Sequence, residues 1–133
     1  MNIHLSTTVR NARATAIVNA LSGGTLKAYS GTMPTTGGDA ITTQTLLGTL
    51  TFANPAGTVS AGVLTFTILT DDASVDADGT WTWARCLDSS NAWVMDVDVS
   101  NNAGTGVIRL PNITVYAGGV LRVSGGTITE GNS

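Results

Sequence analysis

The chain has 133 residues, of which only 11% are charged, and its formal net charge at pH 7 is −3. This length suits one domain, and we expect a single β-rich domain over residues 1–133. Six scattered Lys and Arg residues argue against a nucleic-acid partner, because phosphate binding needs clustered positive charge. No apolar run approaches the roughly 20 residues of a membrane-spanning helix, so no membrane partner is expected.

Residues 5–22 form the one stretch with helical spacing and are predicted to make an N-terminal helix or arm. Ser6 or Thr7 can cap its start, and Gly23–Gly24 provides a left-handed stop. Its apolar stripe is mostly alanine: Leu5, Val9, Ala12, Ala16, Ala20 and Leu21. The helix either lies on the protein's own sheet or docks on a neighbouring subunit. For the second case the interface candidates are Leu5, Val9, Arg10 and Arg13.

Residues 25–130 contain eight or nine short alternating runs, separated by turns rich in Gly, Pro and Asn. This spacing predicts a mainly β fold, an antiparallel β-sandwich or jelly roll with one N-terminal α-helix. The first run, Thr25–Ser30, is followed by a loop at 31–40 that is long for a compact domain. We expect this loop to contact a partner, and Met33 within it is an interface candidate.

All three tryptophans lie within Thr80–Ser100, where two alternating runs flank a polar break and predict a β-hairpin. Pairing Asp88 with Ala92 leaves a three-residue loop whose last residue, Asn91, takes the left-handed conformation. The register then sets Trp81 opposite Val99, Trp83 opposite Val97 and Leu87 opposite Trp93. This apolar face is expected to be the centre of the core.

Arg85 falls on the tryptophan face of this hairpin, where it can lie over a ring as a cation–π contact or take part in an interface. Asp96 and Asp98 are predicted to point to the opposite side, as a solvent-facing acidic row or a docking face for a basic partner. An exposed platform of the three tryptophans would instead favour sugar stacking. That platform is the main alternative to a tryptophan core.

Catalytic and metal chemistry finds little support in the residue types present. His4 has no partner near it in sequence for a nucleophilic triad, and one His with one Cys cannot build a zinc site. Cys86 is expected to be a small, partly buried apolar residue. The acidic loop 71–79 resembles the start of a calcium loop but lacks the closing glutamate. We therefore expect no enzyme, no cofactor and no metal.

Four short segments resemble small virion structural proteins of tailed bacteriophages, of the type that decorates or cements the capsid. They are Leu5–Ala12, Gly23–Gly31, Asp78–Trp81 and Ala117–Gly119. The resemblance implies a β-rich protein, often a homotrimer, made in the host cytoplasm and bound to the outer surface of the virion capsid. Its partners would be the major capsid protein and other copies of itself. The alternative is a binding module of a tail or tail fibre, possibly one for carbohydrate.

Overall fold

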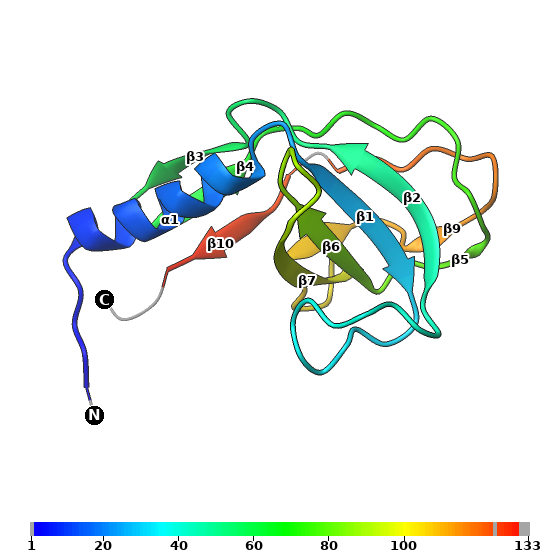
Figure 1. The fold of residues 1–133 in the computed structure, drawn as a ribbon, viewed down its shortest axis with the longest axis horizontal. Helices are drawn as coiled ribbons and strands as arrows, with labels where there is room; N and C mark the ends of the chain where they lie inside the picture. Colours follow the sequence, from blue (N-terminus) through cyan, green and yellow to red (C-terminus); the bar gives the residue numbers. More distant parts are fainter. Residues whose placement is uncertain (1, 124, 131–133) are drawn as a thin grey trace.

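The protein is mainly β, as a computed structural model of residues 2–123 and 125–130 shows (Figure 1). Within these residues it has one helix and ten strands. They are α1 (Thr7–Leu21), β1 (Thr25–Ser30), β2 (Thr45–Thr51), β3 (Gly57–Ser60), β4 (Val63–Phe66), β5 (Gly79–Thr80), β6 (Trp83–Leu87), β7 (Trp93–Asn101), β8 (Ile108–Leu110), β9 (Thr114–Val115) and β10 (Thr127–Thr129). One of the alternating runs in the sequence, 120–124, forms a bridge at Leu121 in place of a strand, and its last residue lies outside the described part.

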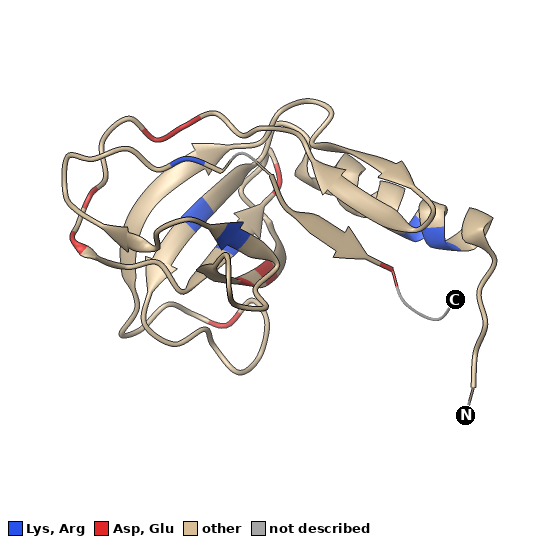
Figure 2. Cartoon of the chain, turned by 180° about the vertical axis from the view of Figure 1, so that it is seen from behind, with Lys and Arg blue, Asp and Glu red and all other residues tan. Residues whose placement is uncertain are grey.

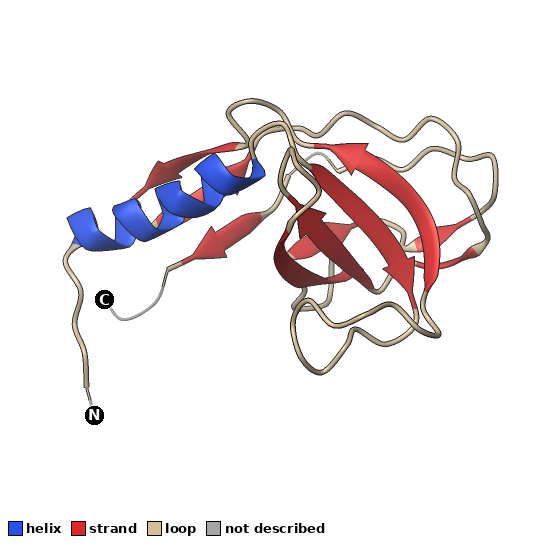
Figure 3. Ribbon diagram, viewed as in Figure 1, coloured by secondary structure: helices blue, strands red, loops and turns tan. Residues whose placement is uncertain are grey.

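The strands form three sheets whose curled shape resembles a half-barrel (Figure 3). The largest sheet has the order β2-β1-β6-β7-β8, the second has the order β10-β4-β3, and β5 pairs with β9. All strand pairs are antiparallel except β7 and β8, which run parallel. This exception arises because the short loop 102–107 doubles back, held by hydrogen bonds from Val107 N to Asp98 and from Gly106 N to Ser100.

Helix α1 lies on its own sheet, against β3 and β4. The Ser6 hydroxyl caps its first turn by accepting the Val9 amide, and Gly23 follows its end with a positive φ, both as predicted. The expected apolar stripe is correct for Leu21 but wrong for its alanines, because the other residues buried along α1 are Ala14 and Val18. No strong apolar stripe exists in this helix, so burial of the larger side chains determines its orientation.

The core lies between the curled sheets and includes Trp81, Leu47, Leu64 and Ile108, each at most 1% exposed. Cys86 belongs to it and is fully buried, more deeply than the sequence suggested. Burial raises the pKa of its thiol to about 12, with a smaller contribution from the charge of Asp96. The thiol is therefore an unreactive apolar group in the folded protein.

The β6–β7 hairpin closes as predicted, with Asp88 N donating to Ala92 O and Asn91 at φ 64°. Leu87 pairs with Trp93, but an irregularity between Cys86 and Leu87 shifts the register beyond that point. The pairs are then Cys86 with Met95, Arg85 with Asp96, Ala84 with Val97 and Trp83 with Asp98.

This one-residue shift corrects the predicted core face. A slip of one residue turns a strand's side chains to the other side of the sheet. Val97 and Val99 therefore join Ala84 and Cys86 in the core. Asp96 lies opposite Arg85, in place of the solvent-facing position that the sequence suggested for it.

Candidate binding surface

The segment 31–44 between β1 and β2 has no regular secondary structure and is anchored at several points. The Thr82 hydroxyl donates to Gly31 O at 2.5 Å, and the Gln44 amide donates to Thr32 O at 2.6 Å. Near its middle, Arg85 Nη1 donates to Asp39 O at 2.8 Å, and Gly38 N donates to Asp96 Oδ2 at 3.3 Å. A loop held at both ends and in its middle presents a defined surface.

A buried ion pair forms the central anchor. Arg85 Nε lies 2.8 Å from Asp96 Oδ1, and Arg85 Nη2 donates to Asp96 Oδ2 at 3.0 Å, so the contact is bidentate. The two side chains are only 10% and 5% exposed. Burial isolates both charges from water, which costs free energy. The attraction between the two opposite charges offsets that cost, so each charge depends on the presence of the other.

The surroundings of this pair favour its charged form. Burial raises the pKa of Asp96, but hydrogen bonds from Arg85, Gly38 and Trp93, with the positive charge of Arg85, outweigh it and leave the pKa below its usual value. The hydrogen bond to Asp96 also raises the pKa of Arg85 further, against the effect of burial. Both groups are therefore ionised at neutral pH.

Two aromatic rings extend this cluster along the sheet. The Tyr29 and Trp83 rings stack at a centroid distance of 4.7 Å and an interplanar angle of 14°, and the Arg85 guanidinium lies 5.4 Å from the Trp83 ring centroid. Burial raises the pKa of the Tyr29 phenol, partly offset by the charge of Arg85. The predicted cation–π contact of Arg85 is thus present with Trp83.

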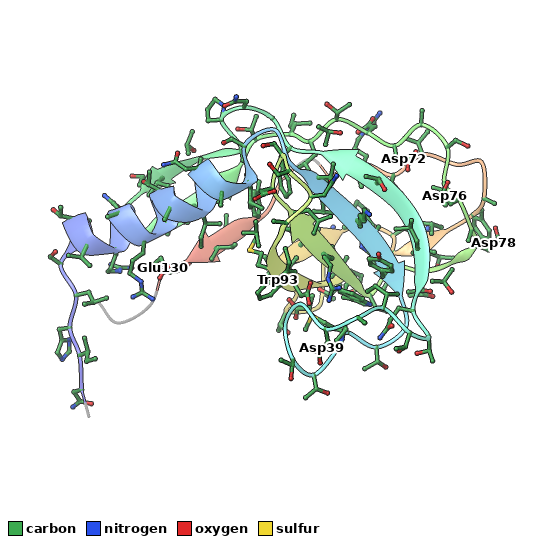
Figure 4. The ribbon with its side chains drawn as sticks, viewed as in Figure 1. Asp39, Asp72, Asp76, Asp78, Trp93 and Glu130 are labelled. Atoms are coloured by element: carbon green, nitrogen blue, oxygen red, sulfur yellow. The ribbon has the colours of Figure 1, made fainter. Side chains whose placement is uncertain are left out.

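Trp93 stands at the edge of the cluster and is 47% exposed (Figure 4). Its indole Nε1 donates to Asp96 Oδ1 at 3.1 Å. The backbone of Gly37 and Gly38 lies so close to its ring that a Cβ on Gly37 would be 2.7 Å from the ring carbon Cζ2. We call residues 31–44 together with Trp93 the loop surface. Met33 contributes a second exposed apolar side chain to it.

The interface candidates from the sequence lie in two separate places. Met33 belongs to the loop surface, and Arg85 lies buried beneath it as an anchor. The other four are on or before α1, where Leu5 is half-buried and Val9 is exposed. In the same region Arg13 pairs with Glu130 at 3.0 Å, and Arg10 Nε donates to Glu130 O.

Two residues of this region escape the sequence interpretation, Trp93 in the loop surface and Asp96 beneath it. The sequence pattern places Trp93 in the core and Asp96 in an open acidic row. The signal that could have found the ion pair is the presence of one Arg and one Asp on facing strands, in the register that a bulge permits. Trp81 and Trp83 are buried, so the alternative of a platform of three exposed tryptophans is wrong.

The acidic loop uses its carboxylates in local hydrogen bonds. Asp72 accepts the amides of Thr49 and Ser74, and Asp78 accepts the amide of Ala117. Among the described residues, no group of three or more His, Cys, Asp or Glu side chains is placed to hold a metal ion. The only helix in that part of the chain, α1, is too short and too polar to span a membrane.

No protein-family model, curated protein or solved structure matches the sequence or the structure.

Proposed function

We propose that this chain is a non-enzymatic structural protein of a tailed bacteriophage that binds the outer surface of the capsid as a decoration protein. The observation that carries the proposal is the loop surface, where exposed Trp93 packs on a loop anchored by a buried ion pair. Aromatic, Met and Arg residues are enriched at protein interfaces. An anchored loop supports binding because docking then costs little conformational entropy.

The proposed partners are the major capsid protein and other copies of this chain, assembled as a homotrimer on the virion. The low charge content of 11% supports a surface that other subunits cover, since charged residues are depleted in interface cores. A trimer would present the loop surface three times. Such multivalency raises the overall affinity for a repeating shell without any new contact.

The test is co-sedimentation of the purified protein with assembled capsids of the phage that encodes it, compared with its unassembled capsid protein. We expect binding to assembled capsids, weakened at least about tenfold by Trp93→Ala, as for a central aromatic contact. Ile68→Ala is the matched control, because Ile68 is also exposed but lies outside the loop surface. Binding only to unassembled subunits, or equal binding by Trp93→Ala, would contradict the proposal.

The alternative is a carbohydrate-binding module of a tail or tail fibre. The observation that favours it is the exposed Trp93 ring, whose indole Nε1 donates to Asp96 Oδ1 and is thereby held in place, since sugars stack on aromatic faces. A glycan ligand would quench the fluorescence of Trp93. That quenching should disappear in Trp93→Ala while the far-UV circular dichroism stays unchanged.

A further inference from the structure

An apolar groove of about 380 Å³ lies at one end of the molecule, beside β9. Buried Trp81 and Leu121 line it, together with Tyr116 and Val120, which are 67% and 57% exposed. Large apolar side chains around a concave surface mark a binding site for another apolar group. The groove is separate from the loop surface, with which it shares no residue.

The acidic segment 71–79 forms one side of this end of the molecule. Its backbone pairs with the groove segment, since Asp72 and Leu121 exchange two hydrogen bonds and Val75 N donates to Gly119 O at 2.8 Å. Four aspartates of this segment and Arg122, which binds Asp71, give a local charge of −4 + 1 = −3. A partner for the groove should therefore carry apolar and positive groups together.

At the opposite end of the molecule, helix α1 carries positive side chains (Figure 2). Arg10 and Arg13 of α1, with Glu130, give a local charge of +2 − 1 = +1. Before α1, residues 2–6 belong to no helix or strand and lead away from the sheets, with Ile3 48% exposed. The two ends of the long axis are thus complementary in charge, and both expose apolar side chains.

Residues 2–6 cannot reach the groove of their own chain. Helix α1 has 15 residues and therefore places their attachment point about 22 Å from its own end at Leu21, at 1.5 Å per residue. Five extended residues span at most about 17 Å. Strand β9, which lines the groove, lies at the other end of the molecule from the start of α1 (Figure 1), so only a second chain can bring such a segment to it.

We propose that residues 2–5 of one copy dock in the groove of a neighbouring copy, with Ile3 as the apolar anchor. Arg10 and Arg13 then approach the acidic segment 71–79 of that neighbour. Such a head-to-tail contact joins two different surfaces, so it produces a closed ring or an open filament. The inference rests on the proposed self-assembly and adds to it the two surfaces through which copies meet, and it does not depend on capsid binding.

The experiment uses two variants, Ile3→Asp with an intact groove and Val120→Asp with an intact N-terminal segment. The molar mass of each is measured by light scattering after size-exclusion chromatography. We expect the wild-type protein to form oligomers, and each variant alone to be monomeric because the dissociation constant rises at least about tenfold. A 1:1 mixture should give a dimer and nothing larger, since only one intact segment and one intact groove can meet.

Two controls exclude effects of charge and of misfolding. Ile68→Asp adds the same charge at an exposed site outside the groove and should assemble like the wild type. Tyr116→Ser removes part of the groove wall without adding charge and should be monomeric. A monomeric wild-type protein, unchanged assembly of Ile3→Asp, Val120→Asp or Tyr116→Ser, dissociation of Ile68→Asp, or no dimer in the mixture would overturn the inference. Capsid binding is measured separately by co-sedimentation, so failure of this contact is distinct from failure of the proposed capsid decoration.

Discussion

Replacing Asp96 with leucine should destabilise the protein by about 3 kcal/mol. Removing one partner of a buried ion pair costs about 3–5 kcal/mol, because the remaining charge stays buried without compensation. Arg85 keeps its hydrogen bond to Asp39 O, and its side chain is 10% exposed, so the lower end of that range applies. Gly38 and Trp93 also lose an acceptor, which loosens the loop surface.

The double variant Arg85→Met/Asp96→Leu separates this explanation from a simple packing defect. Apolar replacement of both members of a buried ion pair is often neutral, so we expect the double variant to be within about 1 kcal/mol of the wild type. The free energy of unfolding is measured by urea titration with circular dichroism, in a double-mutant cycle with both single variants. A cost below about 1 kcal/mol for Asp96→Leu, or a double variant no more stable than it, would refute the reasoning.

Three further predictions concern pH, the tryptophans and the thiol. Folding lowers the pKa of Asp96 below its unfolded value of about 3.9. The contribution of this carboxylate to the free energy of unfolding is therefore complete above about pH 5 and is lost as pH falls through the folded pKa. The difference in unfolding free energy between wild type and Asp96→Leu should therefore narrow from pH 7 to pH 3. Trp81→Ala should lower the free energy of unfolding, measured in urea, by about 3–5 kcal/mol. Trp93→Ala, at an exposed site, should lower it by about 1 kcal/mol or less. Equal losses would contradict the placement of Trp81 in the core and Trp93 at the surface. Cys86, with a pKa of about 12, should react with iodoacetamide at pH 8 only as the protein unfolds, and rapid labelling of the folded protein would show that the thiol is accessible.

Local patterns predicted the elements whose signals lie within a few residues. Strand β1 has the expected bounds Thr25–Ser30, and the hairpin turn closes at Asp88 and Ala92. The cap at Ser6 is also correct. Each of these depends on turn chemistry, capping or period-two alternation, which the sequence carries directly.

The register beyond the hairpin turn depends on contacts that alternation does not encode. Strict alternation favours Trp83 opposite Val97, but the structure pairs Trp83 with Asp98. A bulge brings Arg85 to Asp96, and Asp39 and Gly38 of a distant loop complete the network. The sequence therefore predicted only part of the loop surface: a long loop expected to contact a partner, and Met33 within it as an interface candidate.

Segments with weak patterns were misassigned for a related reason. A Gly-Gly pair such as Gly118–Gly119 is typical of a tight hairpin turn, but in the structure β9 pairs with β5, and Leu121 bridges to Asp72. Two glycines permit a tight turn without requiring that its flanks pair. Competition among short strands is decided by tertiary packing, which overrides local preference.

The central claim, that this chain decorates the capsid of a tailed bacteriophage, is a proposal that an electron cryomicroscopy map of intact particles of that phage tests most directly. We expect density for the chain on the outside of the capsid, with Trp93 and the loop 31–44 buried against the major capsid protein. Density for the chain in the tail, or on the capsid with the loop surface facing solvent, would contradict the account.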